Sequence, residues 1–229
     1  MTSVRLSLIV AVGALFTSSP ALAQDLSHYR NFVLGSSFNA VITASGARPA
    51  AVKVLYERPA RIQELDWRPG YGGAVDLRPD PVRALTFAFV DNALYQIVVT
   101  YDRNRTDALT DADVIESLTA TYGAPAPAAA PVRSRTSPDE TRRDSIVVAH
   151  WESPAASLTL FRGSYTPELQ LVLVSTPLGA RALGAIREAK RLDAVEAPQR
   201  AIDQRKKEAA DADAAREKTR STNKGAFRP

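Results

Sequence analysis

The segment RALTFAFVDNALYQIVVTY, residues 83–101, decides the fold because apolar side chains alternate on both sides of one turn. Leu85, Phe87 and Phe89 recur at every second residue, which is the period of a half-buried β-strand. The next strand, residues 94–101, places Tyr95, Ile97, Val99 and Tyr101 on one face. Between them, Asp91-Asn92-Ala93 tolerates a left-handed backbone. The segment therefore predicts a β-hairpin with a three-residue connection.

Five further strands are predicted on either side of this hairpin. They cover residues 52–56, 61–67, 145–152, 157–162 and 168–174, where apolar residues alternate or cluster between turn residues. Residues 68–81 are rich in Gly, Pro and Asp and predict a loop. Residues 124–143 contain mainly Ala, Pro, Ser, Thr and charged residues without periodicity, which predicts a flexible excursion.

Two short amphipathic helices are predicted, and each precedes a group of strands. The first follows a serine N-cap in Ser36-Ser37, carries Phe38, Val41 and Ile42 on one face, and stops at Gly46. The second follows Thr110 and stops at Gly123; its apolar residues are Val114, Ile115, Leu118 and Tyr122. We therefore expect an α+β fold built from a helix-plus-antiparallel-sheet unit. The unit is either duplicated within one sheet or repeated only by chance similarity.

The C-terminal region predicts helices of a different kind. Residues 177–195 carry a loose apolar stripe that is expected to dock on the body: Leu178, Leu183, Ile186, Leu192 and Val195. Pro198 is expected to interrupt the helix. Residues 199–220 are charged on all sides, which predicts an exposed or marginal helix, and residues 221–229 are expected to be disordered.

The N-terminal residues have the pattern of a secretory signal peptide. Arg5 precedes an apolar run at residues 6–16, and Ala21-Leu22-Ala23 matches a small-x-small cleavage site. We expect three regions: a signal peptide at 1–23 cleaved after Ala23, an α+β domain at 24–176, and a C-terminal helix with a charged, partly disordered tail at 177–229. The chain has no cysteine, which favours the periplasm of a Gram-negative bacterium, with secretion as the alternative. No transmembrane span is expected after cleavage.

Charge is distributed unevenly along the chain. From Arg181 onward there are thirteen basic and eight acidic residues, whereas residues 24–180 hold fifteen basic and seventeen acidic ones. The body therefore gives no reason to expect a nucleic-acid partner. The tail is either a basic arm for an anionic surface, such as lipid headgroups or a cell-wall polymer, or a solvated helix without a partner.

Motifs of catalysis and metal binding are missing from the sequence. The two histidines, His28 and His150, are far apart, and no metal-ligand spacing occurs around them. We expect no metal site, no cofactor and no catalytic residue. The alternative is a hydrolase of an envelope polymer, which would need two carboxylates across a cleft from among Glu57, Glu64, Asp66 and Asp102.

The most suggestive group of residues is aromatic and basic. It consists of Trp67, Arg68, Tyr71, Tyr101, Arg103 and Arg105. Guanidinium groups beside aromatic rings are typical of recognition surfaces. In the alternative interpretation, Trp67 and Tyr101 belong to the core and the arginines solubilise its rim.

The layout resembles two related groups of proteins. The carrying features are Phe32-x-Leu34-Gly35-Ser36-Ser37-x3-Val41, the helix stop at Gly46 to Pro49, and the hairpin at Asp91-Asn92-Ala93-Leu94. They resemble the small outer-membrane assembly lipoproteins of the small-protein-A type and the β-lactamase inhibitor protein. The resemblance implies a domain that binds proteins and catalyses nothing. The chain departs from the lipoproteins in having no lipidation cysteine. Our leading hypothesis is a non-enzymatic, exported protein-interaction or envelope-associated domain with an envelope protein as its partner.

Overall fold

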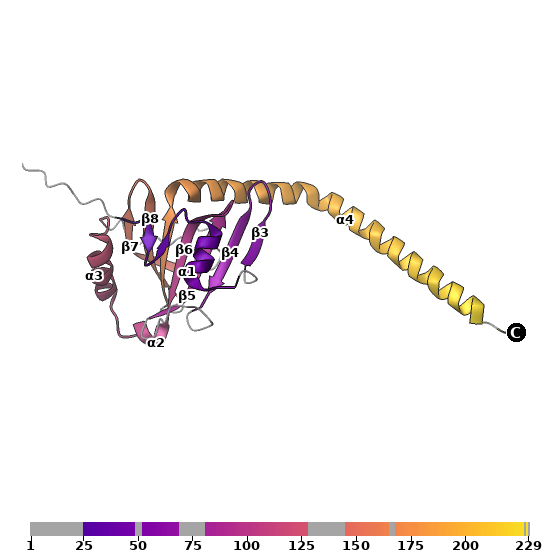
Figure 1. The fold of residues 1–229 in the computed structure, drawn as a ribbon, viewed down its shortest axis with the longest axis horizontal. Coiled ribbons are helices and arrows are strands. Elements are labelled where there is room, and N and C mark those ends of the chain that lie inside the picture. The colour runs from indigo at the N-terminus through magenta and orange to yellow at the C-terminus, as the bar shows by residue number, and fades with distance from the viewer. Residues whose placement is uncertain are drawn as a thin grey trace, which may run out of the picture.

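The protein folds as an α+β domain with a long C-terminal helix (Figure 1). The computed structural model describes residues 25–48, 52–68, 81–127, 145–164, 168–226 and 228. The predicted signal peptide, Tyr71, most of the loop at 68–81 and most of the excursion at 124–143 lie outside the described residues. In the described residues seven strands form one antiparallel sheet in the order β3-β4-β5-β6-β9-β8-β7.

The seven strands agree closely with the sequence-based expectation. They are β3 (Val52–Tyr56), β4 (Ile62–Trp67), β5 (Val82–Val90), β6 (Ala93–Tyr101), β7 (Ser145–Glu152), β8 (Ala156–Gly163) and β9 (Leu169–Ser175). Two shorter strands, β1 (His28–Tyr29) and β2 (Phe32–Val33), pair with each other ahead of the sheet. The short helix α2 (Arg103–Thr106) follows β6.

The central hairpin is tighter than the sequence predicted. Its connection has two residues rather than three, because Ala93 already pairs with Val90. Asp91 and Asn92 both adopt positive φ angles, 45° and 71°, and two consecutive left-handed residues match the twist of adjoining strands. The Asp91 carboxylate also accepts a hydrogen bond from the backbone N–H of Arg61 at 2.9 Å, which ties the turn to the neighbouring strand.

Both short helices begin and end at the residues that the sequence indicated. In α1 (Phe38–Ser45) the Ser37 hydroxyl accepts from the backbone N–H of Ala40, and Gly46 ends the helix at a φ of 65°. In α3 (Asp111–Tyr122) Thr110 and Asp113 form a reciprocal capping box. These caps orient the apolar faces of the helices toward the sheet.

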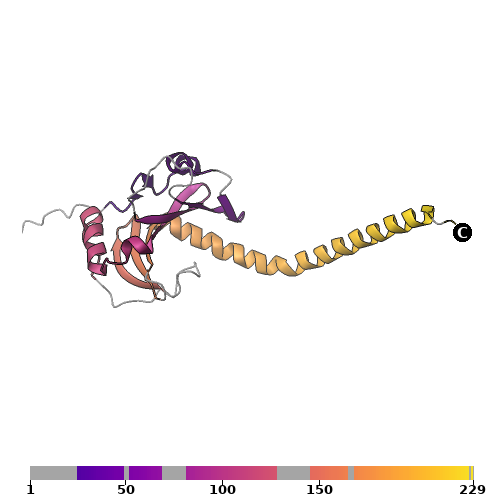
Figure 2. The same ribbon diagram turned by 90° about the horizontal axis from the view of Figure 1, so that it is seen from below.

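The two faces of the sheet support different layers. Phe89 packs on one face with Phe38 of α1, at a ring-centroid distance of 5.3 Å, in the larger core that also contains Tyr122 of α3. The next residue, Val90, faces the other way and belongs to a second core with Ala182 and Ala185. Successive residues of β5 face opposite sides of the sheet, so α1 and α3 pack on one face and the C-terminal helix packs on the other. Figure 2 shows the helical segments on either side of the sheet.

The strand order joins two groups of strands, each preceded by a helix, within one sheet. Each unit is a helix followed by antiparallel strands: α1 precedes β3 to β6, and α3 precedes β7 to β9. The last strands of the units, β6 and β9, pair at the centre with Val98 opposite Val172. The two groups of described strands, four after α1 and three after α3, therefore form a single continuous sheet.

The C-terminal helix differs most from the sequence-based expectation. It is one element, α4 (Thr176–Ala226), that contains Pro198 and extends beyond residue 220. The prediction that Pro198 interrupts the helix was wrong, as was the prediction of disorder for residues 221–226. A proline removes one backbone hydrogen bond and bends a helix without always ending it, and Figure 1 shows α4 changing direction as it leaves the sheet. In the described part of the chain, no helix combines the length and the apolar composition needed to cross a membrane.

Candidate functional site

Small residues allow the first half of α4 to lie close to the sheet. Its buried positions are Gly179, Ala182, Ala185 and Ala189, which follow the three-and-four spacing of one helix face. Leu178, Ile186 and Leu192 are half-buried, as the predicted stripe requires. Leu183 and Val195 instead point to solvent and are 40% and 65% exposed. The predicted stripe was wrong at these two positions because the small residues, not the large ones, mark the centre of the contact.

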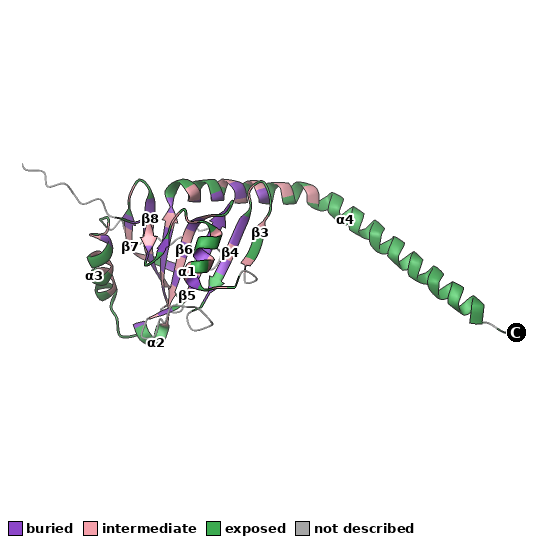
Figure 3. Cartoon of the chain, viewed as in Figure 1, coloured by how far each residue is buried: buried purple, intermediate pink, exposed green. Residues whose placement is uncertain are grey.

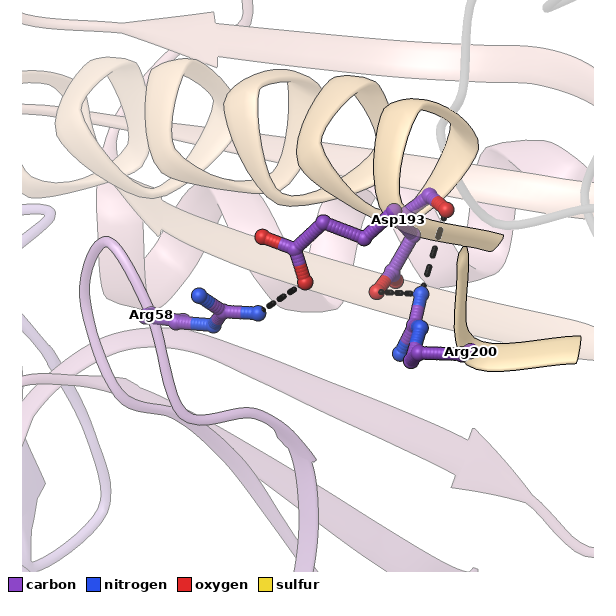
Figure 4. A network of polar contacts seen from close by, with 4 residues as sticks. Arg58, Asp193 and Arg200 are labelled. Carbon is purple, nitrogen blue, oxygen red and sulfur yellow. Dashed lines mark hydrogen bonds and ion pairs between the residues drawn. The ribbon is translucent and has the colours of Figure 1, made fainter. Parts of the chain in front are cut away.

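Ion pairs fix this half of the helix to the body at two places. Arg181 pairs with Asp91 in the turn between β5 and β6. Further along the helix, Glu196 accepts from Arg58, which follows edge strand β3 (Figure 4). Both pairs are partly exposed, and such pairs each contribute roughly 0–1 kcal/mol. They therefore set the direction of α4 more than they stabilise the fold.

A side-chain bridge spans the bend at Pro198. Because Pro198 has no N–H, the helix lacks one backbone hydrogen bond here. Arg200 reaches back and donates to Asp193 twice, to the carbonyl oxygen at 3.1 Å and to the carboxylate at 3.0 Å (Figure 4). The two halves of α4 are thus connected by a charged bridge as well as by the backbone.

A groove of about 170 Å³ lies beside this bend, between β3 and α4. Leu55, Tyr56, Glu57, Arg58, Ala189, Leu192, Asp193 and Arg200 line it. Arg58 and Arg200 each already have a carboxylate partner. Both arginines of the groove are thus compensated, and the groove lies at the joint between body and helix.

Beyond the bend, α4 leaves the body, and of its described residues there only Arg200 lines the groove with β3. Every residue from Gln199 to Ala226 is exposed (Figure 3). We call residues 199–226 the distal helix. Pairs along the helix stabilise it: Arg220 with Glu217 at 2.7 Å, Arg216 with Asp213 at 3.6 Å, and Gln204 with Glu208 at 3.0 Å. Hydrogen bonding to Arg220 lowers the pKa of Glu217 below its ordinary value.

The aromatic and basic residues singled out in the sequence have separate environments. Trp67 is only 4% exposed and packs edge-on against Phe32, with ring centroids 6.4 Å apart. Within the described residues its indole N–H is buried without an acceptor. Arg68, Arg103 and Arg105 are exposed. The indole therefore belongs to the core and the arginines to the surface, and binding by this group of residues stays a prediction.

Tyr101 joins two other tyrosines at one end of the larger core. Burial, followed by the proximity of Tyr29, raises the pKa of the Tyr101 phenol well above its ordinary value of 10.0. Burial also raises the pKa of Tyr122 to about 12, and its hydroxyl donates to the carbonyl of His28 at 3.4 Å. The Arg30 guanidinium lies 5.1 Å from the ring centre of Tyr29. Phenols with an ordinary pKa are already protonated at neutral pH, and the raised pKa of both groups extends this protonated range to higher pH.

The carboxylates considered for hydrolysis lie in different places, and two of them make structural hydrogen bonds. Asp66 accepts from the Thr86 hydroxyl at 2.7 Å, and Asp102 caps α2 by accepting from the backbone N–H of Asn104 at 2.8 Å. Glu57 lies in the groove beside the bend, and Glu64 lies on β4. No pair of them lines the groove described here, so its geometry gives no support to the hydrolase alternative.

Neither histidine lies in a group of metal ligands. His28 is 3.2 Å from Asp25, and the ring of His150 contacts the hydroxyl of Thr159 at 2.9 Å. Among the described residues, no three His, Asp or Glu side chains are close enough together to hold a metal ion.

Comparison of the chain with protein-family models, with curated protein sequences and with solved structures found no match in any of the three.

Proposed function

We propose that the mature protein is an exported, non-enzymatic interaction protein of the cell envelope, in which the sheet domain holds the distal helix out for contact. The observation that carries this proposal is the change within α4 at Pro198. Before it, the helix is packed on the sheet, and after it every residue up to Ala226 is exposed.

The energetics of the distal helix support a binding role. A polar helix that buries no apolar face gains nothing from the core, so helix propensity and side-chain pairs must maintain it. The sequence provides both, since Ala, Lys, Arg, Glu and Gln predominate and charged pairs recur along the helix. Arg200 and the two ion pairs at the body fix its direction. Such a construction favours presentation of the helix to a partner.

The surface of the sheet domain also supports the proposal that the distal helix has the binding role. Among the described residues, the exposed large apolar side chains are aliphatic, namely Val33, Val54, Leu109, Ile146, Leu183, Val195 and Ile202. Exposed aromatic anchors, which dominate many protein interfaces, do not occur in the described part of the body. Two of the seven aliphatic residues, Val195 and Ile202, flank Pro198.

A truncation separates the two parts of the protein. The mature chain from Gln24 to Pro229 and a version that ends at Ala197 are used as baits in an envelope extract. The truncated chain retains Glu196 and therefore its contact with Arg58, so its body should unfold at the same temperature. We expect capture of a partner by the full chain and its loss on truncation.

Two results would contradict the proposal. Equal capture by both chains would place binding on the sheet domain. Release of soluble fragments from purified envelope polymer by the full chain, abolished by Asp66→Asn or Asp102→Asn, would instead establish the hydrolase alternative.

A further inference from the structure

Basic residues gather on one side of the distal helix. In an α-helix successive residues are about 100° apart, and this spacing brings Arg205, Lys206, Arg216, Arg220 and Lys224 into an arc of about 100°. We call these five residues the basic stripe. Lys206 and Lys224 are five full turns apart and point in the same direction.

Acidic residues lie mainly outside the arc. Asp203, Glu208, Asp211 and Glu217 fall on the remaining surface, and Asp213 is the one acid within it. Asp213 contacts Arg216 at 3.6 Å, and Glu217 reaches Arg220 from beside the arc. In the described structure no ion pair involves Arg205, Lys206 or Lys224. The stripe therefore keeps a net positive charge.

One exposed apolar residue lies on the same side as the basic stripe. Ile202 falls within the arc and is 46% exposed. Val195, on the other side of the bend at Pro198, is 65% exposed, the highest value among the exposed large apolar side chains of the described residues. A mixture of basic and apolar side chains on one helix face is typical of helices at lipid interfaces. One aliphatic residue is too few to bury a face in the acyl region, so charge must provide most of the attraction.

The shape of the stripe fits a flat surface. The distal helix is about 40 Å long at 1.5 Å per residue, and its basic residues extend from Arg205 to Lys224. The cations of the stripe lie in two groups on the same side, Arg205 with Lys206 and Arg216 with Arg220 and Lys224, and both groups can contact one plane of anionic headgroups. We infer that the basic stripe, with Ile202, binds the surface of a bilayer containing anionic phospholipid. This inference rests on the proposed role of the distal helix and specifies its partner.

Two double variants with equal charge test the inference. Lys206→Gln/Lys224→Gln removes two lysines of the stripe, whereas Lys207→Gln/Lys218→Gln removes two lysines about 100° or more away. Both variants lower the net charge by the same amount, and lysine and glutamine have similar helix propensities. Circular dichroism should therefore show equal helix content in both variants and in the parent chain.

Binding is measured by sedimentation of the mature chain with vesicles of phosphatidylcholine alone or mixed with phosphatidylglycerol. We expect binding only to the mixed vesicles and its loss in about 0.5 M salt, where exposed charges are strongly screened. The stripe variant should lower the partition coefficient about twenty-fivefold, from roughly fivefold for each lysine near the surface. The off-stripe variant should change it about twofold at most.

Three results would overturn the inference: equal losses in the two variants, equal binding to neutral vesicles, or no binding to either vesicle. If soluble polyphosphate binds the stripe while vesicles do not, the site is one for anionic polymers and the lipid assignment is wrong. If the chain does not bind vesicles but captures an envelope protein only when the distal helix is present, the lipid inference is wrong and the proposed function still holds.

Discussion

Gly179 and Gly184 provide a matched pair of substitutions that tests how α4 packs on the sheet. A Cβ atom at Gly179 would lie 2.8 Å from Cγ1 of Val174 on β9, whereas a Cβ at Gly184 would meet nothing within 4 Å. Replacing a helical glycine by alanine contributes about 1 kcal/mol of stability. At Gly179 this gain is opposed by overpacking, which costs about 1–3 kcal/mol. The valine side chain is short and β-branched, so it cannot swing away freely.

We therefore expect Gly184→Ala to raise the free energy of unfolding by about 1 kcal/mol. Gly179→Ala should lie about 1–3 kcal/mol below Gly184→Ala, which leaves it neutral or destabilised relative to the parent chain. Urea unfolding followed by tryptophan fluorescence measures both, because Trp67 and Trp151 are buried in the sheet domain. If the two variants have equal stability, α4 does not lie against β9 as closely as described.

Three other perturbations test the capping box, the core and the tyrosine group. Thr110→Ala should destabilise the domain by about 1 kcal/mol through loss of the α3 cap. Hydrogen bonding to Thr110 lowers the pKa of Asp113 from its ordinary 3.8, so the contribution of the cap is present above pH 3.8 and is lost as the pH falls through the lowered value. If the acid-unfolding curve of Thr110→Ala runs parallel to that of the parent chain, this pH dependence does not come from the cap. Trp151→Phe should cost about 1–3 kcal/mol because the Gly123 carbonyl loses the indole N–H at 2.7 Å; unchanged urea unfolding would exclude that role. Burial raises the pKa of Tyr122 to about 12, so the contribution of this phenol to the free energy of unfolding should be fully present below pH 10 and should be lost between pH 10 and 12. The difference in tyrosinate absorbance between the parent chain and Tyr122→Phe measures where this phenol ionises, and ionisation at its ordinary pKa would contradict the prediction.

Local structure was predictable wherever neighbouring residues determine it. Alternating apolar residues located the seven strands, and Ser37, Gly46 and Thr110 marked helix ends through their own hydrogen bonds or backbone angles. The two-residue turn was missed by one residue because Ala93 can serve equally well as loop or strand. Here the pairing of Ala93 with Val90, a contact between strands, decided the register.

Features that depend on distant contacts were not predictable from the sequence. The spacing of Val195 suggested docking, yet the close approach of α4 to the sheet is set by small residues such as Ala182, and Val195 faces solvent. Pro198 normally ends a helix, but here Arg200 bridges the bend to Asp193. For Trp67 the sequence left a binding surface and the core as alternatives, and the packing of Phe32 against it decided for the core.

The central pairing of β6 with β9 has a consequence for how the chain must fold. Strand β6 is complete at Tyr101, but its partner on that side begins only at Leu169. Until β9 is present, the first half of the protein exposes an apolar strand edge, and unpaired edges of this kind promote aggregation. Neither half can satisfy its own last strand. Two fragments divided between α3 and β7 should thus aggregate when produced alone and reassemble into the native sheet when refolded together.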